Sequence, residues 1–339
     1  MKKTLPIRNE LNILHNTPIS MEYDGTQPFE EWQKKARAKL SELIGLDKYK
    51  KCDFLLEEKY VKEHKTYREI KFYFQSEENY FVPCILCIPK KSKFEKPPMM
   101  ICLQGHGTGM HISLGRRKFS FDEKKIENGD RDFAVQCVAK GYCALAIEQR
   151  NFGERGGTPK PNCHEPSMVA LLTGRTTVAG RVWDISRAID VLEENYSQYF
   201  DKEKIYCMGN SGGGTATFYA MALEDRIKGG IPSCAFASFE KSIGEKRHCE
   251  CNYIPNIRNY FDMAEIAGMS APKPIVIVSG KTDGIFPAAS AKAEFKRVKE
   301  TYYSASANPE NCVHVIGWEG HRFYAEPAWK AFEKLTEGK

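Results

Sequence analysis

The 339-residue sequence has no long hydrophobic run, no internal repeat and no strong excess of one charge. No segment approaches the ~18–20 consecutive apolar residues of a transmembrane helix, so we expect no membrane partner. Met1-Lys2-Lys3 is followed by Thr-Leu-Pro-Ile-Arg-Asn-Glu, so the apolar core of a secretory signal is missing there. The net charge is only +6 and forms no basic stripe, which argues against a nucleic-acid partner. Hydrophobic residues are 42% and charged residues 28%, which excludes a disordered or coiled-coil chain.

Cysteine is abundant, with 12 residues, but its pattern is not that of a disulfide-rich domain. Several cysteines lie inside apolar runs typical of buried strands, where a thiol behaves as a small hydrophobic side chain. A disulfide framework is instead expected in a short secreted domain. We therefore predict a reducing, cytoplasmic location. The cysteines in question are Cys84, Cys87, Cys102, Cys143, Cys207 and Cys234.

The order of the apolar patterns predicts an α/β fold. Residues 1–27 have little periodicity and are expected to form an N-terminal arm, with residues 28–339 as a single domain. Strands that alternate with helices imply a mostly parallel central sheet, here of about eight strands, with helices on both faces. The first two strands are expected to form an antiparallel hairpin, and residues 156–181 and 235–271 to be insertions that form pocket walls. Strands are predicted at 69–75, 81–88, 99–103, 143–147, 204–208, 229–234, 275–278 and 312–316, and helices at 28–46, 132–140, 182–196, 213–224, 288–303 and 325–335.

The strongest chemical signal is Gly209-Asn210-Ser211-Gly212-Gly213, which follows an apolar strand and opens a helix. This segment fits the G-x-S-x-G nucleophile elbow, in which glycines allow close backbone approach around a strained serine. A glycine-rich turn or a phosphate cradle would also contain glycines, but the Gly-Lys-Ser/Thr of a Walker A loop is absent. We therefore predict Ser211 as a catalytic nucleophile.

A nucleophilic serine needs a base and a carboxylate that orients this base. In this arrangement they follow the serine in the order Ser, Asp/Glu, His. Asp283 lies just after the strand at 275–278, and His321 lies just after the strand at 312–316. Active sites of parallel sheets form at these carboxyl ends, so Asp283 and His321 are the predicted partners. His314 lies within a strand and Asp262 has no strand before it, so each is a weaker candidate.

The oxyanion hole is expected to use the backbone N–H of Gly212 and one N–H from the loop after the strand at 99–103. Thr108 is our choice for the second donor, with Gly107 as the alternative. The glycines of this loop do not have the G-x-G-x-x-G spacing of a dinucleotide site, so no cofactor is predicted. His106 is interpreted as a structural residue that holds the loop.

Two further groups of polar residues are interpreted as structural. Glu148 and Arg150 follow a strand and are expected to form ion pairs, with substrate contact as the minor alternative. The cluster His248-Cys249-Glu250-Cys251 has no second cysteine or histidine pair at zinc spacing, so no metal is predicted. We expect this cluster to belong to a loop over the site or to a subunit contact.

Several blocks between residues 28 and 335 resemble one group of known proteins. They comprise Trp32–Leu46, Gln104-Gly105-His106-Gly107, Glu148–Gly153, Val182–Ala188, Gly209–Gly213, Asp283 with Pro287, and Gly320-His321. The chain is similar to α/β-hydrolases of the acetyl xylan esterase type, near the cephalosporin-C deacetylases and dienelactone-hydrolase-like enzymes. The resemblance implies the α/β-hydrolase fold, a serine hydrolase and homo-oligomers. Asn210 and the lack of a tyrosine after His106-Gly107 depart from the deacetylase pattern.

These observations predict a serine carboxylic-ester hydrolase that acts on short acyl groups, such as acetyl groups on a carbohydrate. The expected partner is a small-molecule or oligosaccharide ester substrate. The alternatives are a non-catalytic ligand-binding protein on the same fold, and a peptidase or acyltransferase that uses the same three residues.

Overall fold

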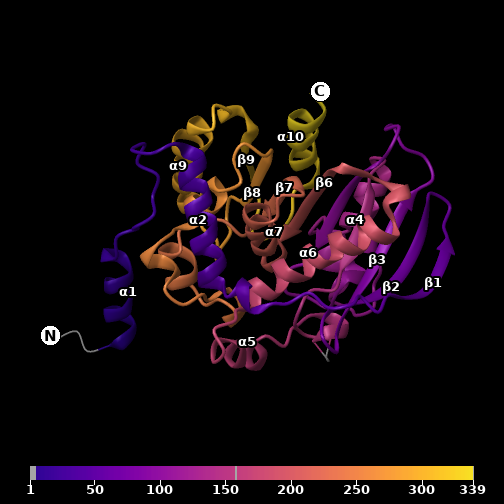
Figure 1. The fold of residues 1–339 in the computed structure, drawn as a ribbon, viewed down its shortest axis with the longest axis horizontal. Coiled ribbons are helices and arrows are strands. Elements are labelled where there is room, and N and C mark those ends of the chain that lie inside the picture. The colour runs from indigo at the N-terminus through magenta and orange to yellow at the C-terminus, as the bar shows by residue number, and fades with distance from the viewer. Residues whose placement is uncertain (1–4, 157–158, 339) are drawn as a thin grey trace.

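A single sheet of nine strands organises the chain in the computed structural model, which describes residues 5–156 and 159–338. Figure 1 shows this sheet running from β1 at one edge towards β9. The order across the sheet is β1-β2-β3-β5-β4-β6-β7-β8-β9. The strands are β1 (Glu57–Glu63), β2 (Tyr67–Glu77), β3 (Tyr80–Pro89), β4 (Pro98–Leu103), β5 (Cys143–Ile147), β6 (Asp201–Asn210), β7 (Ile227–Ser233), β8 (Ile275–Gly280) and β9 (Cys312–Gly317).

The strand directions agree with the predicted architecture. Strands β1, β2 and β3 are antiparallel to their neighbours, and β4 to β9 pair in parallel. Eight strands match the predicted ones, and β1 is the additional strand. Because β1 is an edge strand whose residues are exposed except for the half-exposed Tyr60, it has no apolar pattern by which the sequence would reveal it.

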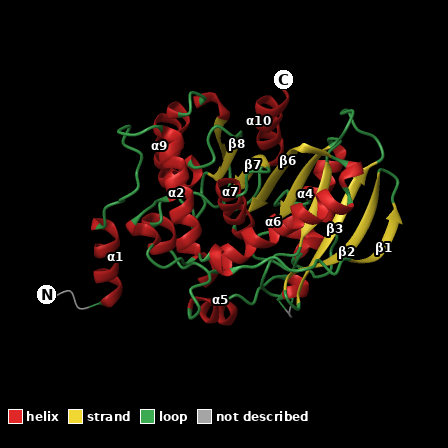
Figure 2. Cartoon of the chain, in the orientation of Figure 1, coloured by secondary structure: helices red, strands yellow, loops and turns green. Residues whose placement is uncertain are grey.

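Helices cover both faces of the sheet, as Figure 2 shows. Helices α2, α6, α7 and α8 contribute to the larger apolar core, and α4 and α10 contribute to the core on the other face. The six predicted helices are present, although α6 begins five residues earlier than predicted. The helices are α1 (Pro6–Asn16), α2 (Phe29–Ile44), α3 (Asp122–Ile126), α4 (Phe133–Ala139), α5 (His164–Leu171), α6 (Thr177–Asn195), α7 (Gly212–Leu223), α8 (Met263–Gly268), α9 (Ala288–Arg297) and α10 (Ala325–Glu337).

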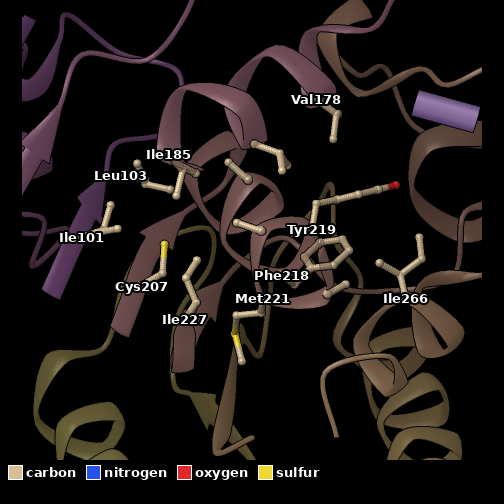
Figure 3. Packing of buried hydrophobic residues seen from close by; sticks show 14 of the residues in the cluster. Ile101, Leu103, Val178, Ile185, Cys207, Phe218, Tyr219, Met221, Ile227 and Ile266 are labelled. Carbon is tan, nitrogen blue, oxygen red and sulfur yellow. The ribbon is translucent and has the colours of Figure 1, made fainter. Parts of the chain in front are cut away.

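Alternation along each central strand divides the core between the two faces. In β4, Ile101 and Leu103 belong to the larger core, and Met100 and Cys102 belong to the other. Figure 3 shows Ile101 and Leu103 in the region where Cys207 of β6 and side chains of α6 and α7 also pack. This double burial explains why the central strands are continuous apolar runs.

The predicted N-terminal arm contains a helix, α1. Its amphipathic pattern is short, and Figure 1 shows it lying apart from the sheet. The predicted insertion at 156–181 contains α5, and its residues 157 and 158 lie outside the described part of the chain. The insertion at 235–271 contains α8. Among the described helices, none combines the length and the apolar character that a bilayer-spanning segment requires.

Candidate active site

Ser211 lies on the sharp turn between β6 and α7. Its φ of 57° and ψ of −125° are in a region that a non-glycine residue rarely adopts. Gly213 allows this turn to approach β4, because a Cβ atom there would lie 2.1 Å from the carbonyl oxygen of Leu103. The turn therefore has the geometry of a nucleophile elbow, with the N-terminus of α7 directly behind the serine.

Asp283 and His321 form a hydrogen-bonded pair. The Nδ1 atom of His321 lies 2.7 Å from Oδ2 of Asp283, which is buried. The other carboxylate oxygen of Asp283 accepts hydrogen bonds from the backbone N–H groups of Ile285 and Phe286. Burial alone would raise the pKa of Asp283, but these hydrogen bonds and the His321 ring hold it below its ordinary value. Asp283 is thus suited to orient the imidazole as a carboxylate.

Ser211 and His321 line the same cavity, which has a volume of about 350 Å³. The three predicted catalytic residues therefore come together at the carboxyl ends of β6, β8 and β9. The weaker candidates lie elsewhere: Nε2 of His314 is 2.9 Å from Oγ of Ser279, and Asp262 caps the N-terminus of α8. Both have structural partners of their own.

The loop after β4 packs directly against the elbow. A Cβ atom on Gly105 would lie 2.8 Å from Cβ of Ser211, and one on Gly212 would lie 3.2 Å from Nδ1 of His106. His106 therefore packs against the nucleophile turn, and its structural role stays a prediction. The assignment of the second oxyanion donor to Thr108 or Gly107 stays a prediction.

A buried network behind Thr108 was not anticipated from the sequence. The hydroxyl group of Thr108 donates to Oδ1 of Asp122, and Nε2 of His111 lies 2.9 Å from Oδ2 of the same carboxylate. Asp122 also accepts two backbone hydrogen bonds, from Lys118 and Phe119. These partners hold the loop after β4 in place at Thr108. Asp122 lies in a segment without strong periodicity, so no sequence signal pointed to it.

The expected ion pairs at the end of β5 are confirmed for Arg150 and wrong for Glu148. Arg150 pairs with Asp184 and Glu77. Within the described residues Glu148 has no ion pair, and its carboxyl group instead accepts the backbone N–H of Met110 at 3.0 Å. Burial raises the pKa of Glu148 to about 8. This buried carboxyl group thus holds the loop after β4 at Met110.

The cavity beside Ser211 is lined by three cationic side chains, Lys125, Arg131 and Arg247. Arg131 is buried, and its guanidinium group donates to the carbonyl oxygen of His321 at 3.4 Å. Lys125 donates to the carbonyl oxygen of His106 at 2.8 Å. In the part of the chain that the structure describes, none of the three forms an ion pair. Burial lowers the pKa of Lys125 to about 8, but these basic side chains still favour a negatively charged group in the cavity.

The cluster at 248–251 divides between two environments. Nε2 of His248 lies near the hydroxyl group of Ser242 and the carbonyl oxygen of Ile285, on the cavity wall. Burial lowers the pKa of His248. Cys251 is buried and lies against His106, with 3.3 Å between Sγ and Nε2. The prediction that this segment forms a loop over the site agrees with its position on the cavity wall.

The turn at Ser211, the order of the three polar residues and the sheet topology together define the α/β-hydrolase fold. Comparisons with known proteins agree with this fold. The sequence model of an α/β-hydrolase family (Abhydrolase family) matches residues 15–163, and that of the prolyl oligopeptidase family matches residues 175–333.

The chain is also similar to individual proteins. A Bacillus subtilis protein named as a hydrolase, YtaP, is 25% identical over 241 residues, which are 69% of this chain and 75% of that protein. A Bacteroides fragilis structure described as an acetyl xylan esterase superposes with a TM-score of 0.77 at 16% identity, over 96% of this chain and 84% of that one. A glucuronoyl esterase from Solibacter usitatus gives a TM-score of 0.68 at 16% identity, over 95% and 97%. These structural similarities show the shared fold.

Proposed function

We propose that the protein is a serine carboxylic-ester hydrolase that removes short acyl groups, such as acetyl groups, from carbohydrate esters. The observation that carries this proposal is the Asp283–His321 pair on the cavity that Ser211 lines. The similarity to proteins described as acetyl xylan and glucuronoyl esterases supports an ester substrate. A hydrolase is also consistent with the name of the Bacillus subtilis relative.

In the proposed mechanism, Oγ of Ser211 attacks the ester carbonyl carbon while Nε2 of His321 takes the hydroxyl proton. Asp283 holds the imidazole by its Nδ1–H and stabilises the imidazolium. The backbone N–H of Gly212 and a donor of the loop after β4 stabilise the oxyanion. His321 then returns its proton to the leaving alcohol. In the second half, His321 activates a water molecule that releases the acyl group as a carboxylic acid.

The proposal is tested by hydrolysis of 4-nitrophenyl acetate, butyrate and octanoate by the wild type and by Ser211→Ala. We expect turnover to favour acetate and to fall at least about 10³-fold in the variant, because the nucleophile is lost. A fluorophosphonate probe should label the wild type at Ser211 and leave the variant unlabelled. Circular dichroism checks that the variant is folded. A wild type that neither turns over esters nor reacts with the probe would indicate a ligand-binding protein instead.

The alternative of a peptidase with the same residues is tested on the same samples. An arylamide with the same acetyl group should be hydrolysed far more slowly than the ester, since the amine is a poorer leaving group. The prolyl oligopeptidase match at 175–333 covers the nucleophile, acid and base and does not by itself distinguish the two reactions. Faster cleavage of peptide substrates than of any ester would replace the esterase proposal.

The three cavity cations, which have no ion pair among the described residues, favour a second candidate substrate class, esters that also carry a carboxylate. A charge-assisted hydrogen bond to such a group contributes about 1.5–3 kcal/mol, which corresponds to about 10–100-fold in kcat/KM. The natural ester would then belong to an acidic sugar or to a dicarboxylic acid.

Arg247→Gln distinguishes the two substrate classes, because Arg247 is exposed at the cavity and its loss leaves the core unchanged. We expect the ratio of kcat/KM for 4-nitrophenyl succinate to that for 4-nitrophenyl acetate to fall about tenfold in this variant. Raised salt should lower the same ratio in the wild type. A ratio that neither change alters would leave the neutral acetyl ester as the substrate class.

A further inference from the structure

Four metal-ligating side chains from three distant segments converge beside the nucleophile elbow. His106 comes from the oxyanion loop, Cys163 from the insertion at 156–181, and Cys249 and Cys251 from the insertion at 235–271. One ligand atom of each, the imidazole nitrogen or the sulfur, lies within 4.8 Å of all the others. The sequence gives no such grouping, because only Cys249 and Cys251 are near each other along the chain.

The spacing of these atoms suits a tetrahedral zinc ion. With Zn–S distances of about 2.3 Å and Zn–N distances of about 2.0–2.1 Å, the ligand atoms of a tetrahedral site lie about 3.5–3.8 Å apart. In the structure, Nε2 of His106 lies 3.3 Å from Sγ of Cys251 and 3.7 Å from Sγ of Cys163. A small contraction of the remaining distances would complete the tetrahedron.

A buried arginine supplies an independent argument for negative charge at this point. Arg181 is 2% exposed, and Nη1 lies 3.6 Å from Sγ of Cys251. Its other contacts are the carbonyl oxygen of Arg150 and the ring of Phe152, and its Nε has no hydrogen-bond partner. No carboxylate of the described residues pairs with it. A zinc ion with three thiolates and one imidazole carries a net charge of −1, which Arg181 would neutralise.

From this geometry we propose that His106, Cys163, Cys249 and Cys251 form a structural Cys₃His zinc site. Four protein ligands leave no open position for a water molecule, so the ion would not act on the substrate. Binding would release the thiol protons of the three cysteines to solvent. The proposal replaces the sequence-based expectation of no metal, which rested on spacing along the chain alone.

The site would act by positioning the catalytic parts. The ring of His106 would bind zinc by Nε2, and its Nδ1 edge faces Gly212, whose N–H is the predicted oxyanion donor. The same ion would join both pocket-wall insertions to the oxyanion loop. His106, Cys163, Cys249 and Cys251 are therefore positioning residues, and this role rests on the proposed hydrolase function, whereas metal binding does not.

The primary test measures metal directly. Protein purified under reducing conditions from zinc-supplemented cells should contain about one zinc ion per chain by mass spectrometry of the metal content. Replacement of zinc by Co²⁺ should give the intense visible absorption of tetrahedral, sulfur-rich cobalt. Neither measurement depends on activity, so failure of the esterase proposal would leave them unaffected.

Variants assign the ligands. Changes to residues around a metal's ligands typically lower affinity about 10–100-fold, and Cys251→Ser, which removes a ligand, should lower zinc affinity by more than this. Cys52→Ser is the matched control, because Cys52 is a half-exposed thiol that contacts the backbone oxygen of Gln75 and lies outside the cluster, and it should retain full zinc. If Cys251→Ser is poorly folded, Cys249→Ser provides the second variant, since Cys249 is less buried. Removal of zinc should lower kcat for 4-nitrophenyl acetate with little change in KM.

Three results would overturn the proposal. One is reduced wild-type protein that contains no zinc and gives no cobalt spectrum after reconstitution. Another is a Cys251→Ser variant that retains zinc as tightly as Cys52→Ser. The third is a disulfide among Cys163, Cys249 and Cys251 in freshly purified, alkylated protein, which would assign the cluster to redox chemistry.

Discussion

Asp283 and Asp262 are both buried aspartates, but their partners differ. Asp283 contacts the His321 ring, and Asp262 accepts the N–H of Met263 in a capping box with Glu265. We predict that Asp283→Asn lowers kcat by about 10⁴-fold, because the amide favours the wrong imidazole tautomer. Asp262→Asn should retain turnover and lose about 1 kcal/mol of unfolding free energy. Ester hydrolysis and urea denaturation of the two variants check this. Equal losses of kcat in both would contradict the assignment of the acid.

Glu148 should make the stability of the protein depend on pH. Burial raises the pKa of its carboxyl group from 4.5 to about 8 in the folded chain. Between these values the folded state binds more protons than the unfolded state, so the free energy of unfolding falls as pH rises. The stabilising contribution is complete below pH about 4.5 and is lost as pH rises through about 8.

The variant Glu148→Gln removes this proton while it keeps an acceptor for the N–H of Met110. We predict that the wild type loses up to about 1.4 kcal/mol per pH unit more than the variant across pH 5–8. Urea unfolding of both proteins at several pH values measures the difference. Parallel curves would mean that Glu148 is ionised in the folded state.

Alanine substitutions at two glycines of connecting segments should distinguish the cost of a strained backbone from the cost of a steric clash. Gly153 has a φ of 46°, and a Cβ atom there would lie 2.2 Å from Oε2 of Glu148. Gly174 has a φ of 70° with nothing within 4 Å of the same position. Gly174→Ala should lower the free energy of unfolding by about 1–2 kcal/mol, because only the left-handed backbone conformation disfavours alanine there. Gly153→Ala should cost a further ~1–3 kcal/mol from overpacking. Thermal and urea unfolding compare the two, and equal costs would show that Glu148 moves aside freely.

At the scale of elements, the sequence predicts the strands and helices whose apolar residues follow a regular spacing. The central strands are apolar throughout because both faces are covered, and α2 and α7 begin and end within two residues of their predicted bounds. Ser211, Asp283 and His321 can be predicted because each comes directly after a strand. Strand β1 was missed because it is exposed, and α5 and α8 because they are short helices in irregular insertions.

The parts of the site that the sequence does not reveal depend on contacts between distant segments. Asp122 lies 14 residues from Thr108, and Cys163 lies far from His106 along the chain. Neither pairing has a fixed spacing, so only the folded arrangement brings them together. The same applies to Glu148, where the sequence shows a charged residue but not the backbone N–H groups around it.

At the scale of the whole molecule, α1 docks on the insertion at 235–271. A Cβ atom on Gly244 would lie 2.5 Å from Cδ2 of Leu14, and His15 lies 3.1 Å from Glu240. We predict that Leu14→Asp releases this helix and speeds subtilisin cleavage within α1, because the apolar contact is lost. Ile7→Asp is the matched control, since Ile7 is 57% exposed and its change should not alter cleavage. Equal cleavage rates for the two variants would contradict this docking.

His321 follows β9, which pairs only with β8 at the edge of the sheet. Edge strands unfold locally at a lower free energy than central ones. A molecule whose edge has frayed would thus retain Ser211 on its central turn and lose His321, the base of the proposed mechanism. Under that mechanism, Ser211 would become nucleophilic only when the sheet is complete.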